Sequence, residues 1–183
     1  IMDDTLMFCY QCEQTAGGKG CTKRGVCGKS PEVANMQDLL IYQLKGISIY
    51  AEGYLREGKN IPKEYISFIE DSLFQTLTNV NFDKDDHIKM LLKSQELKDK
   101  IKREQSSIKT DRDEALFKLR PQPKDILADT KRAGIMFEKS LDEDIRSLRE
   151  TIIFGLKGIA AYSHQARFIG YFDDDVDNFF CKA

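Results

Sequence analysis

The sequence predicts an all-α fold: two tandem three-helix-bundle units, the second of them incomplete, preceded by a cysteine-rich loop. Three observations lead to this prediction. After residue 30, apolar side chains recur mostly at spacings of three, four and seven, the period of an amphipathic helix. Capping residues and glycines mark where these stretches begin and end. The longest stretch recurs 112 positions later, and such self-similarity indicates repeated structural units.

The first predicted helix covers residues 31–57. Ser30 supplies a hydroxyl N-cap, Pro31 suits the first turn, and Glu32 faces the positive end of the helix. Gly58 follows at the position where a left-handed residue ends many helices. The stripe that we expect to be buried consists of Met36, Leu39, Leu40, Leu44, Ile47 and Tyr54.

Two more helices complete the first predicted unit, residues 30–105. Pro62 opens a helix that extends to residue 79, and Asp83 caps another over residues 84–105. The short connections between the three helices predict an up–down–up bundle.

The rest of the chain repeats this pattern only in part. Residues 106–123 form a polar connection with at most a partial helix, and residues 124–183 form a second, truncated bundle. Within it, a short helix stops at Gly134, a long helix covers residues 142–170, and the acidic run 173–175 begins a last helix.

A few isolated residues are predicted to play structural parts only. We expect Cys181, in an apolar stretch with no cysteine nearby, to be a small buried hydrophobe. His87 and His164 stand alone on polar helix faces and are predicted to be solvated, as are the clustered lysines of residues 84–105.

The repeat indicates that the second unit is unfinished. A shift of 112 positions places Leu44–Ile47 on Leu156–Ile159 and Gly58 on Gly170. Any two amphipathic helices share some likeness, but the common register and the shared glycine favour two related bundles. Residues 173–183 then match only the start of the second helix of the first unit. We therefore expect an exposed apolar seam, covered by the rest of a longer protein, by a partner or by a second copy in a homodimer.

The composition excludes several functional classes. The net charge of the 183 residues is −2, so no broad attraction to nucleic acid or to a membrane surface is expected. No apolar run approaches the roughly 20 residues of a membrane span. Residues 1–7 contain two acids and no apolar core of a signal peptide, so we expect a cytoplasmic protein, in which disulfides are rare.

Four cysteines near the amino terminus carry the strongest chemical signal. Cys9, Cys12, Cys21 and Cys27 follow the spacing C-x2-C-x8-C-x5-C within the predicted loop, residues 7–29. Four thiolates suit a soft metal or a metal cluster. Zinc sites usually use two close cysteine pairs, whereas only the first two cysteines form one here. Iron–sulfur clusters tolerate such irregular loops.

The loop composition also favours an iron–sulfur cluster. Its glycines allow backbone N–H groups to turn toward sulfur atoms, and its basic residues place positive charge nearby. Zinc, a redox dithiol and disulfides remain the alternatives. No nucleophile–base pair or carboxylate pair stands at catalytic spacing, so we predict no catalytic residue. The basic residues are Lys19, Lys23, Arg24 and Lys29.

The stretch "MFCYQCEQTAGGKGCTKRGVCGKSPEVANMQDLLIYQLKGISIYAE" resembles the amino-terminal end of the hybrid cluster proteins, also called prismane proteins or hydroxylamine reductases. The segments "TLTNVNFD" and "DEDIRSLRETIIFGLKGIAAYSHQA" resemble later parts of the same helical domain. The resemblance covers Met7 to Ala183. It implies a helical domain of two three-helix bundles, and a [4Fe–4S] cluster bound by Cys9, Cys12, Cys21 and Cys27. Members with longer gaps between the cysteines carry a [2Fe–2S] centre instead.

The resemblance further implies an oxidoreductase in which this cluster passes electrons to a hybrid iron–sulfur–oxygen cluster. There hydroxylamine is reduced to ammonia, and nitric oxide reduction is also proposed. The ligands of the hybrid cluster cannot be mapped onto this sequence, so the fragment alone is expected to be inactive. Its implied partners are the missing carboxy-terminal domains and an electron donor protein. The alternative is a non-catalytic helical binding module stapled by zinc or by a cluster.

Overall fold

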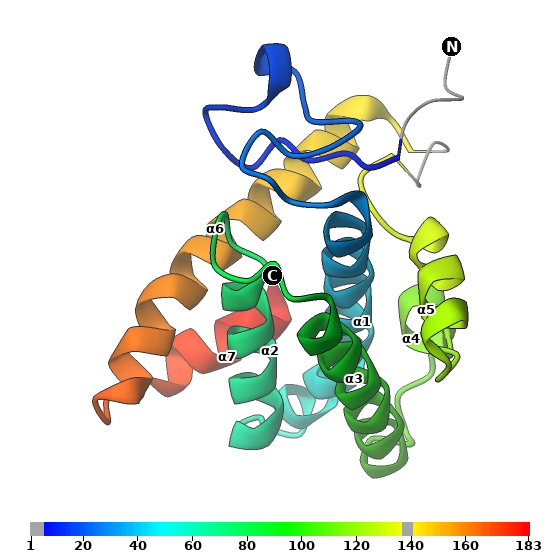
Figure 1. Ribbon diagram of the computed structural model, residues 1–183. Helices are drawn as coiled ribbons and strands as arrows, with labels where there is room; N and C mark the ends of the chain where they lie inside the picture. Colours follow the sequence, from blue (N-terminus) through cyan, green and yellow to red (C-terminus); the bar gives the residue numbers. More distant parts are fainter. Residues whose placement is uncertain (1–5, 137–140) are drawn as a thin grey trace.

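The computed structural model describes residues 6–136 and 141–183, and these residues form helices joined by loops, without a strand. An antiparallel bridge joins Cys9 to Cys21. The all-α prediction is confirmed. Figure 1 shows the α-helices, whose bounds are α1 Pro31–Arg56, α2 Lys63–Gln75, α3 Lys84–Glu104, α4 Asp113–Leu116, α5 Pro123–Asp129, α6 Glu143–Phe168 and α7 Asp174–Lys182.

The ends of α1 are those that the sequence predicts. The Ser30 hydroxyl accepts a hydrogen bond from the Val33 N–H at 3.2 Å, and Pro31 occupies the first turn. At the other end Gly58 has a φ of +70°, and the Lys59 N–H reaches back to the Tyr54 carbonyl at 2.9 Å. This left-handed cap stops the helix.

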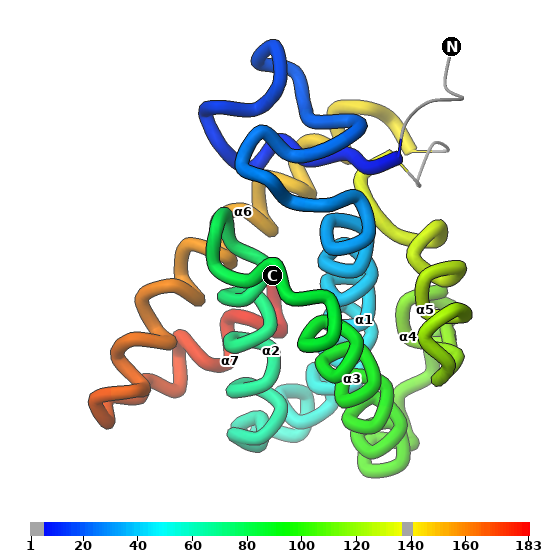
Figure 2. Tube along the Cα trace, viewed as in Figure 1, coloured from blue at the N-terminus to red at the C-terminus, as the bar shows by residue number. Residues whose placement is uncertain are grey.

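The next two helices run as predicted, with one shorter end. In Figure 2, α1, α2 and α3 run alternately down, up and down beside one another. Asp83 caps α3 by accepting from the Asp86 N–H at 2.9 Å. The second helix ends at Gln75 rather than at residue 79, because the backbone turns there and Asn79 has a left-handed φ of 62°.

The core of this bundle continues into the second half of the chain. Buried side chains from α1, α2, α3, α6 and α7 form one apolar cluster. A buried ion triad ties the two halves together, because Arg167 of α6 donates to Glu70 of α2 at 2.7 Å and to Asp177 of α7 at 2.9 Å. The division into separate units at residues 30–105 and 124–183 stays a prediction.

The repeat is visible in the structure itself. Helices α1 and α6 each have 26 residues, and both ends of α6 are displaced by 112 positions from those of α1. Their caps also match: Gly170 has a φ of +90°, and the Tyr171 N–H donates to the Ala166 carbonyl at 2.9 Å. The two helices therefore begin and end in the same way.

Their surroundings differ, and the expected apolar seam is present. Leu148 and Tyr162 of α6 are 66% and 83% exposed, whereas their repeat equivalents in α1, Met36 and Tyr50, are 0% and 2% exposed. The spacing of these residues places them on one face of the helix. We call this face the α6 seam; it consists of Ile145, Leu148, Ile152, Gly155, Ile159 and Tyr162, of which Ile159 alone is half-buried.

Two glycines show a further contact that α1 makes and α6 lacks. A Cβ added to Gly46 of α1 would lie 2.2 Å from the Glu114 carbonyl oxygen, so α4 approaches the α1 backbone at this point. A Cβ added to Gly158, the repeat equivalent in α6, would meet no atom within 4 Å in the described parts of the chain. The contact that requires glycine in the first copy therefore has no counterpart in the second.

Two predictions about polar side chains are wrong, and a third, for His164, holds only in part. His87 is fully buried, because the first turn of α3 packs against Gln37 of α1. Lys98 is also buried, since the connection after α3 crosses it and its ammonium donates to the Phe117 carbonyl at 2.7 Å. His164 is half-buried: it stacks on Phe74 and lies 2.8 Å from an Asp71 oxygen.

The helices of the described residues are unlike membrane-spanning helices. None of them combines the length and the apolar character that crossing a membrane demands.

The repeat gives a matched pair of stability predictions. Met36→Ala removes a fully buried side chain and is expected to lower the free energy of unfolding by about 3 kcal/mol. Leu148→Ala, at the equivalent position of α6, is expected to change it by less than about 0.5 kcal/mol, because Leu148 is mostly exposed. Urea unfolding followed by circular dichroism measures both, and equal losses would contradict the assignment of the α6 seam.

Candidate metal-binding site

The four cysteines lie in one loop that covers the amino-terminal end of α1 and runs beside the first half of α6 (Figure 1). Cys9 and Cys21 exchange two backbone hydrogen bonds, of 3.1 and 2.8 Å. The Thr22 carbonyl accepts from the N–H groups of Leu6 and Met7 on the opposite strand of the loop. The first and third cysteines are therefore held side by side.

The turn between Cys9 and Cys12 is closed by Thr15. Its N–H donates to the Cys12 carbonyl at 3.1 Å, and its hydroxyl donates to the Cys9 carbonyl at 3.0 Å. The same hydroxyl lies 3.7 Å from the Cys21 sulfur, so Thr15 joins the Cys9–Cys12 turn to the third cysteine.

Two glycines are required where the loop passes close to itself. Gly20 has a φ of +147°, and a Cβ on it would lie 2.7 Å from the Phe8 ring. A Cβ on Gly25 would lie 3.0 Å from the Cys27 sulfur. The loop thus keeps room around its thiols that any side chain at these positions would fill.

The thiols themselves fit a metal-binding role. All four are free of disulfides; Cys21 is buried and the other three are half-buried. The Ala16 N–H donates to the Cys21 sulfur at 3.5 Å. Backbone hydrogen bonds from Ala16 and Val26 lower the pKa of Cys21, which favours the thiolate that a metal needs.

The spacing of the sulfur atoms bears on the kind of metal centre. Tetrahedral zinc with Zn–S bonds of about 2.3 Å brings its ligands within about 3.8 Å of one another. In the described residues, no three of these thiols lie within 4.8 Å of one another; the group that does is Glu70, Asp71 and His164. The Glu70 carboxylate in that group already binds Arg167. As the loop stands, the four thiols in the described residues do not form the compact tetrahedron that a single zinc ion requires.

A buried polar chain supports the loop from below. Lys29, two residues after Cys27, is only 1% exposed and donates to the Gln37 oxygen at 2.6 Å. The Gln37 nitrogen in turn donates to His87 Nε2 at 3.1 Å, and His87 Nδ1 donates to the Asp83 carbonyl at 2.6 Å. This chain fixes the neutral form of His87 and connects the loop to α1 and α3.

Helix α6 forms the second support of the loop. The Tyr10 hydroxyl donates to Glu150 at 3.0 Å, and the Tyr10 ring lies 5.6 Å from the Phe154 ring. In its hydrogen-bonding orientation, the Gln11 amide donates to the Thr76 carbonyl and accepts from Lys157 Nζ, both at 3.1 Å. The turn that carries Cys9 and Cys12 is thus clamped onto α6.

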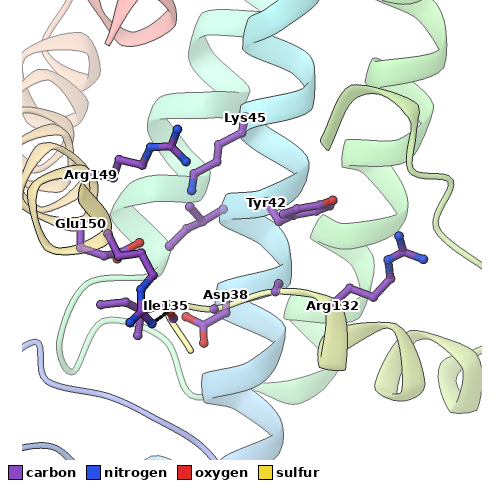
Figure 3. A pocket seen from close by; sticks show the side chains of 11 residues that line it. Asp38, Tyr42, Lys45, Arg132, Ile135, Arg149 and Glu150 are labelled. Atoms are coloured by element: carbon purple, nitrogen blue, oxygen red, sulfur yellow. Dashed lines mark hydrogen bonds between the residues drawn. The ribbon is translucent and has the colours of Figure 1, made fainter. Parts of the chain in front are cut away.

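Opposite charges face each other between α1 and α6. Burial raises the pKa of Asp38 to about 7, an effect that the Lys157 charge opposes. Burial likewise lowers the pKa of Lys157 to about 8, and Asp38 opposes this shift. Figure 3 shows the adjoining hollow, in which Lys45 of α1 and Arg149 of α6 reach toward each other above Asp38.

Cys181 does not belong to the site. It is buried among the apolar side chains of α1, α2 and α6, as the sequence predicts. Burial raises the pKa of its thiol to about 12, so it stays protonated and is a poor metal ligand.

Comparison with known proteins identifies the family. The family model described as "Prismane/CO dehydrogenase family" matches residues 7–183. The chain belongs to this family. It is similar to proteins named hydroxylamine reductase: 44% identical over 182 residues to the one of Clostridium novyi and 44% over 180 residues to that of Thermoanaerobacter pseudethanolicus. The protein of Methanocaldococcus jannaschii is 40% identical over 179 residues.

These alignments cover 97% of this chain but 32% of each of the three relatives. The chain therefore spans about a third of the length of the prismane-family proteins that it matches. The resemblance given by the cysteine motif is confirmed at the level of the family.

Sequence reasoning found the cysteines but missed their supports. Asp38, Glu150 and Lys157 stand in no recognised motif, and for Lys29 the sequence predicts only a positive charge near the cysteines. The one signal in the sequence was the match of Lys157 to Lys45 in the repeat. That match indicates a shared helix and says nothing of what the side chain contacts.

The buried polar chain predicts a pH dependence of stability. Burial holds the pKa of His87 below its usual value of about 6.5, so the unfolded chain binds this proton more readily. The contribution of neutral His87 to the free energy of unfolding is fully present above about pH 6.5. It is lost as the pH falls from there through the lowered pKa of the folded protein. In urea unfolding at pH 7.5, 6.5 and 5.5, His87→Gln should lose less stability on acidification than wild type. Parallel losses in the two proteins would contradict the prediction.

Proposed function

We propose that Cys9, Cys12, Cys21 and Cys27 bind a [4Fe–4S] cluster, and that this chain is the electron-entry domain of a hydroxylamine reductase. The observation that carries the proposal is the set of four uncrosslinked thiols in one loop, of which no three in the described residues lie within 4.8 Å of one another. When bound, the cluster supplies one-electron transfer.

The surroundings of the loop suit an anionic centre. Four thiolates around an iron–sulfur core leave net negative charge, which nearby cations and N–H donors stabilise. Lys29 and Lys157 are buried beneath the loop, and the Ala16 N–H already points at the Cys21 sulfur. Cytosolic placement would keep the thiols reduced for cluster assembly.

The reaction of the whole protein belongs to parts beyond these residues. We propose that hydroxylamine is reduced to ammonia at a hybrid cluster held by later domains, as the names of the relatives suggest. In this proposal the four cysteines hold the cluster that receives the electron. Tyr10 and Phe154 shield the cluster on the side of α6, and the other, exposed side of the loop faces a donor protein.

We further propose that the later domains cover the α6 seam. The equivalent face of α1 is buried by α3 and α4, so a helical segment of the remaining protein suits the same geometry on α6. Charged residues would be excluded from such a contact, and the α6 seam carries none.

Anaerobic reconstitution with ferrous iron and sulfide tests the cluster. About four iron and four sulfide per chain are expected, with an EPR signal after reduction. Replacing any one of the four loop cysteines with alanine should lower the iron content at least several-fold, whereas Cys181→Ala should leave it unchanged. One zinc per chain without sulfide would instead support a structural metal module.

The coverage of the α6 seam is tested with Leu148→Glu in two contexts. In the 183-residue chain the melting temperature should stay within about 2 °C, because the new charge remains in water. In the full-length protein the same change buries a charge and should cost several kcal/mol. Sedimentation of the 183-residue chain distinguishes coverage by later domains from coverage by a second copy. A dimer that Leu148→Glu dissociates would show that a second copy covers the α6 seam.

A further inference from the structure

The side chain of Lys157 is in an unusual position for a lysine. It is only 5% exposed, although it lies on α6, the helix with the exposed seam. Its ammonium donates to the Gln11 oxygen at 3.1 Å and borders a small hollow that Cys9 also lines. Lysine is rarely buried without a partner, because desolvating its charge is costly.

The charges around Lys157 come from three elements. Asp38 of α1 and Glu150 of α6 are its acidic neighbours, and Lys29 of the loop is a second cation in the same hollow. Two carboxylates and two ammonium groups therefore balance before any metal is bound. Thiolates at Cys9 and its partners would add negative charge directly above this group.

The repeat provides an internal comparison. Lys45, the equivalent of Lys157, is half-buried and borders the hollow of Figure 3 between α1 and α6. It lies two turns along α1 from Asp38 and does not border the hollow that contains Cys9. Of these two equivalent lysines, Lys157 contacts the cysteine loop and Lys45 does not border its hollow.

We propose that Lys157 is a positioning residue of the cluster site: through Gln11 it holds the Cys9–Cys12 turn on α6, and its buried charge favours the reduced state of the bound cluster. The inference rests on the proposed function, since it assumes that the four cysteines bind a cluster. The reduction in question adds one electron from an external reductant, and no bond forms or breaks. A cation nearby stabilises the added negative charge.

The test measures the reduction potential of the reconstituted cluster by EPR-monitored titration against a mediated electrode at pH 7. Removing Lys157 alone leaves the half-buried Asp38 carboxyl able to take up a proton, which would hide the loss of charge. The comparison is therefore Asp38→Asn against Asp38→Asn with Lys157→Met. We expect the second variant to have a potential lower by about 59 mV, equivalent to a tenfold change in the one-electron equilibrium.

Matched variants distinguish a charge effect from general disruption. In the Asp38→Asn background, Lys157→Arg keeps the charge and should restore most of the potential, and Lys45→Met should leave it unchanged. Circular dichroism of the metal-free chains checks that each variant is folded.

A second measurement tests the clamp without any metal. Iodoacetamide labelling of the apo chain, read by mass spectrometry, should modify Cys9 and Cys12 faster in Lys157→Met than in wild type, with Cys27 unchanged. An unchanged potential together with unchanged labelling would overturn the proposal. A wild-type chain that assembles no cluster, by contrast, would overturn the proposed function.

Discussion

Burial of α1 along nearly its whole length is the constraint on which the rest of the structure depends. Its apolar side chains belong to both main clusters of the core, and α3, α4 and α7 all pack against it. The cysteine loop is attached to its first turns, where Asn35 donates to the Leu6 carbonyl at 2.8 Å. Because α1 cannot shift without opening the core, the loop stands on a fixed base.

The second feature that organises the molecule is the burial of cations. The Lys98 ammonium donates to the carbonyls of Glu114 and Phe117, and the ammonium groups of Lys29 and Lys157 each donate to an amide oxygen. The charge of Asp38 also favours the charged form of Lys157. Each arrangement offsets a large desolvation cost. Lys98 joins the connection to α3 and thus has a structural role. Lys29 and Lys157 lie under the cysteines, where the negative charge of thiolates would offset the desolvation cost of the two ammonium groups.

The helices could be predicted because their signals are local. Ser30, Asp83 and Gly58 act on their own turns, and the structure uses all three as the sequence indicates. The second helix ends before its predicted last residue, because the chain turns and Asn79 takes a left-handed conformation. No proline or glycine next to it in the sequence indicates this turn.

The polar interior could not be predicted, since its partners come from distant segments. His87 meets Gln37 across 50 positions, and Arg167 meets Glu70 across 97. For a lone histidine or lysine on a polar helix face, no local sequence pattern indicates which distant side chain will pack over it. The four cysteines could be singled out because their spacing is typical of metal ligands. Their supports, Lys157 and Asp38, could not, because charges that act on each other between two helices leave no spacing in the sequence.

The two copies of the long helix show how far a helix sequence determines its role. Both copies keep the same length, the same left-handed cap and the same apolar face, so these properties follow from the residues themselves. Burial does not follow: Tyr50 is enclosed and Tyr162 is in water. The position that holds Lys45 at a solvent-facing hollow in one copy carries an ammonium into the support of a cysteine loop in the other. A repeated helix therefore supplies a scaffold, and its chemical role comes from what packs on each face.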